Sequence, residues 1–405
     1  MTKNFLKYGL ASLALACGVG AVTMVGCSSD SGTTDGGADG SPADQQNPQD
    51  VQNPMDTGAP DSGTLGKLLA VHASPDLPPI RFCYKVNGAL SPLPPLPQEL
   101  SPAQIAAGAP FAGLYQGTGG PLPSTGTDLG PLTITPILIK AQSVKDYVKG
   151  GDGGVKVCSD LLAPDAGFNL VAGTDYWTLA DIPANTFKHD HTYILAATGC
   201  RSNTTIGGGN MLATLAKCGA DWNNNSGNLA VKIYDVDRTV ADPQKMGAQF
   251  LHLSPIIGAG TTGITPALAT PGANDGGTKL ELIALQPVQF PNLAPMTATG
   301  VGKPTLNANP LLSTAFVGTP ILPDGGPGTQ IALPLPIVEK LTTGYSPDGG
   351  LMYTNGANFT FIALGDPTVP QFVDQLGQAQ PDGGAFNGYY IHVIGMPNDP
   401  VIPKL

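Results

Sequence analysis

Charged side chains are scarce in this 405-residue sequence, in which Asp, Glu, Lys and Arg together make up 12%. Helical proteins carry many such residues on their exposed helix faces, so this small share disfavours a helical fold. Positive charge is the scarcer sign, with 19 Lys and Arg against 30 Asp and Glu. The net charge of −11 repels a phosphate backbone, and nucleic acid is therefore not an expected partner.

Motifs that bind metals or cofactors are also missing. Six cysteines are present, but none forms a CxxC pair, which disfavours zinc and thioredoxin-type sites. The run Gly207-Gly208-Gly209 lacks the Lys-Ser/Thr ending of a phosphate loop, and no Gly-x-Ser-x-Gly occurs. Five histidines leave few ways to build a Ser/His/Asp triad. We therefore expect no cofactor.

Turn-forming residues are abundant instead, with 54 Gly and 40 Pro. Together with many Thr, Val, Ile and Leu residues, they favour short strands joined by turns. The run Ile80–Val86 is rich in β-formers and ends at Asn87-Gly88, a strong hairpin signal. The sequence therefore predicts an all-β fold with long loops and few short helices.

The N-terminus resembles a bacterial lipoprotein signal. Lys3 and Lys7 form a basic head, the uncharged stretch 8–26 follows, and Met24-Val25-Gly26-Cys27 closes the segment. The resemblance implies that residues 1–26 are a signal peptide and that Cys27 receives lipid on its sulfur. Ser28 at the next position implies sorting to the outer membrane. Cys17 is a rival lipidation site, and an uncleaved membrane anchor is the alternative for the whole segment.

An acidic tether is expected over residues 27–63. It is built from Ser, Asp, Gly, Pro, Gln and Thr, and it contains seven Asp but no Lys or Arg. Such a segment buries too little apolar surface to offset its ordering entropy, so we expect it to be disordered. The mutual repulsion of its charges should extend it between the membrane and the folded part.

Two disulfides are expected in an exported chain with four remaining cysteines. Three pairings are possible, and we favour Cys83–Cys158 with Cys200–Cys218, in which short loops close first. Both bonds would then lie in the first half of the folded part. Reduction is accordingly expected to lower the melting temperature of residues 64–242 and to leave residues 243–405 nearly unchanged.

An internal repeat divides the folded part. The pattern apolar-His-apolar-Ser-Pro occurs around His72 and again around His252, and the strand-like segments 191–199 and 358–365 share an aromatic and aliphatic character ending on Gly. We therefore predict two tandem antiparallel β-sandwich domains, 64–242 and a divergent copy at 243–405.

Several of these segments resemble a known protein family. The run His72-Ala73-Ser74-Pro75-Asp76, the Phe-Cys-Tyr strand and the segment 193–199 resemble an exported bacterial β-sandwich family of unassigned function that opens with V-H-A-S-P-D and often occurs in tandem. The second copy departs from this pattern because no Asp follows Pro255. The family has no agreed catalytic residues, so the resemblance implies none.

Histidines are the candidate functional residues. His189 and His191, at i and i+2, would share one face of a strand and could bind a metal; the alternative is an exposed loop before a strand at 192–198. His72 and His252 recur at equivalent places in the two copies. They either bind a ligand at the strand ends or lock a turn by hydrogen bonding.

The sequence as a whole favours a lipid-anchored protein of the cell envelope, held at the outer membrane. We expect a non-enzymatic module that binds or scaffolds a surface polysaccharide or a protein partner, and that contacts the membrane through its lipid. The alternative is an extracytoplasmic hydrolase whose site assembles from dispersed His, Asp and Ser residues. Convergence of such residues in one deep cleft would favour the hydrolase.

Overall fold

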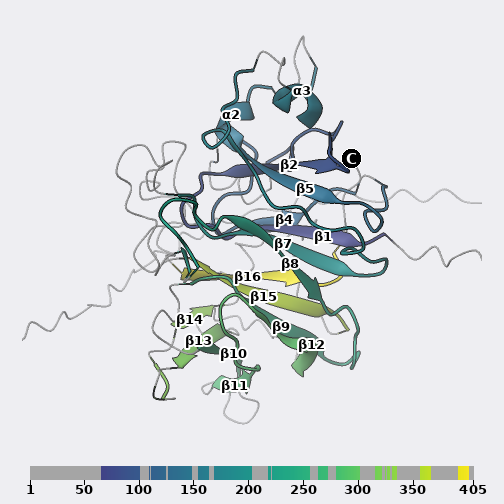
Figure 1. Cartoon of the computed structure of the whole chain (residues 1–405). Helices are drawn as coiled ribbons and strands as arrows, with labels where there is room; N and C mark the ends of the chain where they lie inside the picture. The colour runs from purple at the N-terminus through teal and green to yellow at the C-terminus, as the bar shows by residue number, and fades with distance from the viewer. Residues whose placement is uncertain are drawn as a thin grey trace, which may run out of the picture. The chain divides into compact units, whose positions relative to one another are not determined.

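The computed structural model describes a chain that is almost entirely β-structure within the compact unit Asp61–Leu405 (Figure 1). It describes residues 65–400 except for 101–108, 110, 125, 148–153, 164–167, 203–217, 220, 256–262, 272–279, 302–314, 322–323, 325, 329–330, 335–355 and 366–390. The predicted signal peptide and tether, with Cys17, Cys27 and Ser28, lie outside these residues. No helix in the described ranges is both long and apolar enough to cross a membrane.

The first half of this unit contains two four-stranded sheets. Outer sheet 1 has the order β3-β2-β5-β6, from Ala89–Leu90, Ile80–Val86, Ile134–Lys140 and Tyr176–Thr178. Inner sheet 1 has the order β4-β1-β7-β8, from Gly119–Pro121, Lys67–His72, Thr192–Thr198 and Ala230–Val236. Two short helices, α2 (Ala141–Val144) and α3 (Cys158–Leu162), lie between β5 and β6 in the chain.

The second half repeats this arrangement. Inner sheet 2 has the order β12-β9-β15-β16, from Leu293–Val301, Met246–His252, Asn358–Gly365 and Ile391–Pro397. Outer sheet 2 has the order β11-β10-β13-β14, from Leu280–Ala284, Gly263–Pro271, Ala315–Ile321 and Ile331–Pro334. In both halves, successive strands join the inner and outer sheets in the same order. The two sandwiches therefore share one topology.

The predicted fold class is therefore confirmed, with one added detail. Each inner sheet contains one parallel pair, β1 with β7 and β9 with β15, while the other named strand pairs are antiparallel. The predicted hairpin is also present: Asn87 and Gly88 have φ values of 47° and 85° and join β2 to β3. The domain boundary at residues 242 and 243 stays a prediction.

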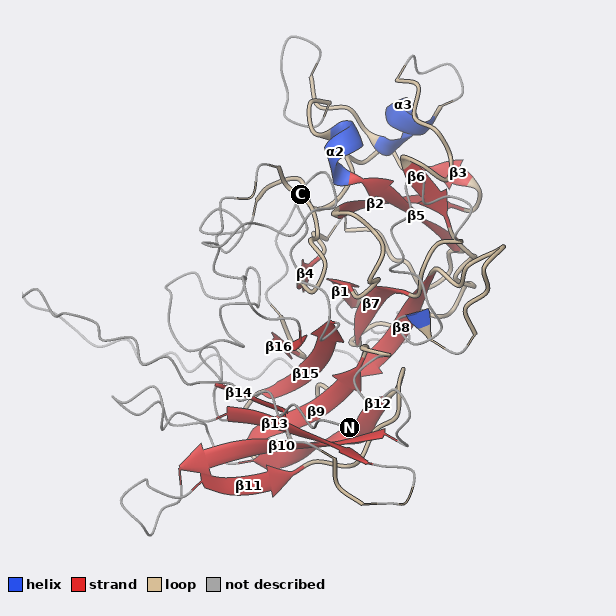
Figure 2. Cartoon of the chain, turned by 90° about the vertical axis from the view of Figure 1, so that its left-hand side faces the viewer, coloured by secondary structure: helices blue, strands red, loops and turns tan. Residues whose placement is uncertain are grey.

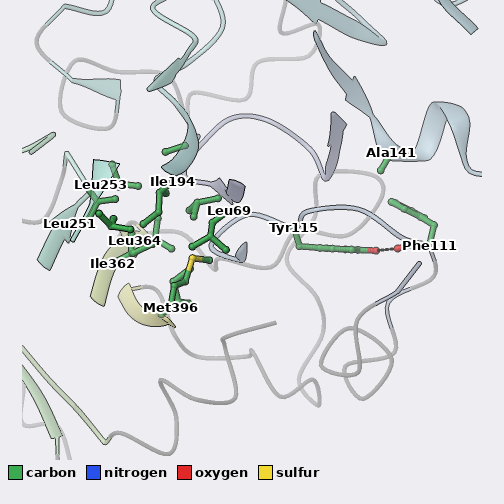
Figure 3. Packing of buried hydrophobic residues seen from close by; sticks show 14 residues of the cluster. Leu69, Phe111, Tyr115, Ala141, Ile194, Leu251, Leu253, Ile362, Leu364 and Met396 are labelled. Carbon is green, nitrogen blue, oxygen red and sulfur yellow. Dashed lines mark hydrogen bonds between the residues drawn. The ribbon is translucent and has the colours of Figure 1, made fainter. Parts of the chain in front are cut away.

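Both inner sheets are covered on both faces. Alternate residues of β1 and β7, such as Leu69 and Ile194, join a core with Leu251, Ile362 and Met396 of inner sheet 2. Figure 3 shows these side chains packed together. The intervening residues, such as Ala70, pack toward outer sheet 1. Strand side chains point alternately to opposite faces, so burial of every residue in β7 and β9 requires a covering layer on each side.

The four sheets thus pack in the order outer 1, inner 1, inner 2 and outer 2, and both views of the ribbon show these layers (Figures 1 and 2). Outer sheet 2 contributes Ile264 to a core with Phe250 and Phe361 of inner sheet 2. The two sandwiches therefore share an apolar core between their inner sheets, and we expect them to be coupled in stability.

Hydrogen bonds fix the connector between the two sandwiches. The fully buried amide of Gln249 accepts a bond of 2.8 Å from the backbone N–H of Asp237, just after β8. Asn358 donates to the carbonyls of Asp237 and Thr239 at 3.0 and 2.8 Å, and Asn398 donates to that of Asp237 at 2.7 Å. Buried amides are costly unless they are bonded, so this network holds the connector against inner sheet 2.

Candidate functional site

An apolar cavity lies between the two sheets of the first sandwich. Inner sheet 1 lines it with Leu68 and Leu195, and outer sheet 1 lines it with Phe82, Tyr84 and Ile134. Loops close the remaining sides with residues that include Leu96, Leu122, Leu129, Ile182 and Phe187. Its walls are drawn from two hydrophobic clusters of this sandwich, and the cavity lies where those clusters leave space between them.

The size and chemistry of this cavity suit a small apolar ligand. Its volume is about 360 Å³, whereas natural interiors have few voids larger than a water molecule. Ligand pockets are typically apolar with a few polar groups, as this one is. Ser124 and Thr127 are exposed lining residues and mark where the cavity meets solvent.

An aspartate and a histidine hold the loop beside this opening. Asp128 accepts a 2.9 Å bond from the backbone N–H of Gly130 through Oδ1. Its Oδ2 lies 3.1 Å from Nε2 of His189. The bond from Gly130, followed by that from His189, lowers the pKa of Asp128. The pair thus joins the loop containing Thr127 to the segment containing Phe187.

His189 and His191 contact different carboxylates in the described structure. Asp190 between them has a φ of 59°, a left-handed conformation that breaks the strand geometry. Strand β7 begins only at Thr192, so both histidines lie in the preceding loop, as the alternative held. Nδ1 of His191 lies 2.8 Å from Oδ2 of Asp235, whereas His189 contacts Asp128. No cluster of three metal-ligating side chains occurs among the described residues.

His72 lies at the end of β1 and hydrogen-bonds the turn that follows. Its side chain is fully buried at the end of β1, with Nε2 3.0 Å from the carbonyl oxygen of Pro78. A carbonyl only accepts, so Nε2 carries the hydrogen and donates to the turn that leads into β2. Burial lowers the pKa of His72 to about 4. This geometry favours turn locking, and ligand binding by His72 stays an untested prediction.

Replacing His72 by glutamine should flatten the pH dependence of stability. The unfolded imidazole takes up a proton near its ordinary pKa of 6.5, but the folded one does not until about pH 4. Folded wild-type protein therefore loses roughly 3 kcal/mol relative to the unfolded state as pH falls through this window. Urea unfolding at pH 7 and pH 4.5 measures the difference, which should be smaller for His72→Gln. His189→Gln, at an exposed histidine, is the control. An unchanged pH profile for His72→Gln would contradict this account.

His252 lies at the matching place in the second sandwich. It is buried at the end of β9, with its ring centre 6.0 Å from that of Phe290 and 6.4 Å from that of Phe250. It therefore sits in an aromatic environment, and its proposed ligand role also stays a prediction.

His72 and His191 do not converge on one cleft. The parallel register pairs Lys67 with Thr192 and His72 with Ala197, so His72 and His191 lie at opposite ends of the β1–β7 pair. Because His72 pairs with Ala197, six residue steps separate it from the level of His191, which is about 20 Å at the usual rise per residue. This separation does not favour a hydrolase site assembled from these two histidines.

Both predicted disulfides are present. Cys83 on β2 is bonded to Cys158 at the start of α3, and Cys200 after β7 is bonded to Cys218. The side chain of Asn228 links the backbones of the two cysteines of the second disulfide. It accepts a hydrogen bond from the N–H of Cys200 at 2.8 Å and donates one to the carbonyl of Cys218 at 2.9 Å.

A buried ion pair links the opening motif of the first sandwich to the end of β7. Oδ2 of Asp76 accepts bonds from the backbone N–H and from Nε of Arg201, at 2.9 and 3.3 Å. Ser74 donates to the other carboxylate oxygen at 3.1 Å. Ser74 and Asp76 of the opening motif therefore have structural roles. Arg201 could not be predicted as their partner, because 125 positions separate it from Asp76.

A second, more open hollow of about 470 Å³ lies beside this pair and includes Tyr176, Trp177 and Ser226 in its lining. The Arg201 guanidinium lies 5.5 Å from the centre of the Trp177 ring, and Trp177 is only 9% exposed. The aromatic face that could stack on a sugar is therefore largely covered. The cavity in the first sandwich is the better-formed candidate site.

Sequence analysis singled out histidines and missed the residues that form this site. The cavity walls are ordinary apolar strand residues, which composition and motifs cannot distinguish from core. Asp128 and Asp235, the partners of His189 and His191, were likewise not predicted because they are distant in the chain.

Comparison with known proteins adds little to this geometry. No family model and no curated protein matches the chain. One solved structure, named "putative cell adhesion protein" and from Bacteroides eggerthii, is 12% identical over 85% of this chain and 98% of its own. Its TM-score is 0.19, a value too low to support a conclusion about fold or function. The function must therefore be inferred from the chain itself.

Proposed function

We propose that this protein is a lipid-anchored, non-enzymatic binding module of the bacterial cell envelope, placed at the outer membrane. The cavity of the first sandwich is the observation that carries the binding role. Among its described lining residues, Lys67 and Tyr84 are the side chains that titrate, apart from the bonded Cys83. Nζ of Lys67 is already bonded to Asp399 at 2.6 Å. The site thus offers shape and apolar surface, which suit binding.

Two further observations support an exported location. Both disulfides belong to the first sandwich, and such bonds persist in oxidising compartments. The junction at Cys27 has the form of a lipoprotein signal, and the acidic segment up to residue 63 would hold the folded unit off the membrane. A surface polysaccharide or a protein partner at the envelope remains part of the proposal.

Lipid attachment at Cys27 is tested by substitution. We expect Cys27→Ser to abolish incorporation of a fatty-acid analogue and to leave the chain as an unprocessed precursor or to release it from the membrane. Cys17→Ser is the matched control and should behave as wild type. Incorporation that survives Cys27→Ser but disappears in Cys17→Ser would move the lipidation site and contradict this assignment.

A further inference from the structure

We propose that the cavity of the first sandwich binds a single long aliphatic chain, the acyl chain of a lipid or of a free fatty acid. This inference rests on the proposed function, and it adds a ligand of the cavity to the surface polysaccharide or protein partner proposed above. It uses a different part of the chain from the lipid attachment at Cys27, so the two can be tested separately.

The walls of the cavity are mainly apolar. Leu68, Phe82, Leu122, Ile134 and Leu195 face it from both sheets and from a connecting loop. An apolar cavity of about 150 Å³ stays dry and takes up benzene, and this one measures about 360 Å³. Apolar walls on this scale favour an apolar occupant, because a polar group placed there would lose its hydrogen bonds to water without regaining them.

The opening defines where the polar end of the ligand lies. The hydroxyl residues Ser124 and Thr127 are exposed at the edge of the cavity, while the interior is apolar. Lys67 donates to Asp399 and to the carbonyl of Pro400, at 2.6 and 2.8 Å, so its ammonium group already has two acceptors. The site therefore selects an apolar tail and leaves the head group at the solvent edge, which is the chemistry of an acyl chain.

The position of the tether favours a lipid source. Leu65, Gly66 and Lys67 begin the described part of the chain, and all three line the cavity. The segment 27–63 therefore joins the folded unit beside the cavity. A protein tethered at this point would keep the cavity within the reach of that segment from the membrane surface.

Photolabelling of the full chain tests the proposal. Purified full-length wild-type protein is irradiated with a long-chain fatty acid carrying a diazirine on its chain, and labelled peptides are mapped by mass spectrometry. We expect label on peptides containing Leu122–Leu129 and Ile182–Phe187, which line the cavity from two loops. Label confined to other surfaces of the folded unit would overturn the proposal.

Two variants and one control make the test specific. Leu195→Trp fills the cavity from β7, and Thr127→Trp obstructs its edge from an exposed loop, which keeps the test valid if the first variant fails to fold. Each should reduce cavity labelling by about tenfold, the equivalent of 1.4 kcal/mol in binding. Ser226→Trp, in an exposed loop outside the cavity lining, should label as wild type. Unchanged labelling of folded Thr127→Trp would overturn the proposal.

Competition identifies the source of the chain. Unlabelled fatty acid that removes the cavity label supports a free fatty acid, whereas removal only by phospholipid vesicles supports a membrane lipid. Failure of both to compete would overturn the acyl-chain assignment. A failed Cys27→Ser test would remove the anchoring part of the proposed function and leave this readout intact, because the label is mapped on cavity peptides.

Discussion

Replacing Cys83 and Cys158 together by alanine is expected to lower the free energy of unfolding by about 4.5 kcal/mol in the chain-entropy estimate. The bond joins β2 of outer sheet 1 to α3 across 75 residues, so its loss frees a long loop in the unfolded chain. It also removes sulfur atoms that pack with Ile137, Ile139 and Leu161 in one buried cluster. Urea unfolding of the wild type and of the double variant measures the loss.

The matched control is the double alanine variant of Cys200 and Cys218. This bond spans 18 residues, and its loss should lower the free energy of unfolding by only about 3 kcal/mol. Equal losses in the two double variants would contradict the loop-length argument. The sequence alone predicts an effect confined to residues 64–242. The core shared by the inner sheets leads us to expect that the second sandwich is destabilised as well.

Replacing Arg201 by methionine should lower the free energy of unfolding by about 3–5 kcal/mol, because it leaves a buried charge without its partner. The side chain of Asp76 is 1% exposed, against 16% for Arg201. Burial raises the pKa of Asp76, and the charge and hydrogen bonds of Arg201 act in the opposite direction. Without Arg201, the carboxylate keeps Ser74 and one backbone N–H as donors.

The double variant Asp76→Asn with Arg201→Met provides the control. It removes the charge as well as its partner, so it should recover part of the stability that Arg201→Met loses. The loss in Arg201→Met should also shrink as pH falls, because a protonated Asp76 needs no counter-charge. Chemical unfolding at neutral and acidic pH measures both effects. A loss that is independent of pH and is not relieved by Asp76→Asn would rule out this explanation.

The β-sandwich fold could be predicted because its signals are local. Asn87-Gly88 specifies a hairpin turn whatever surrounds it, and runs of β-branched and aromatic residues define strands such as β2 and β7. The echo of His72 at His252 correctly indicated a duplicated topology, since both histidines end the first strand of their sandwich. The favoured disulfide pairing was also correct: it gives shorter loops than the other two pairings, although Cys83–Cys158 still spans 75 residues.

The candidate site could not be predicted in this way. An apolar residue that lines a cavity has the same sequence pattern as one that fills a core, and only packing distinguishes Leu195 from Ile194 on the same strand. His189 and His191 attracted attention as a pair because of their spacing. In the structure they contact different carboxylates, those of Asp128 and Asp235. The left-handed backbone conformation of Asp190 between them turns the two side chains apart.

The sequence by itself determined the turns, the repeat and several strands of this protein, because their signals lie in neighbouring residues, and it favoured the disulfide pairing that the structure has. Only the tertiary structure decided that the two inner sheets share a core, that Asp76 meets Arg201, and that the first sandwich encloses an apolar cavity. These features depend on side chains that are distant in the chain and that meet only when the sheets pack face to face. Local patterns carry no record of which faces meet or of how completely they fill the space between them.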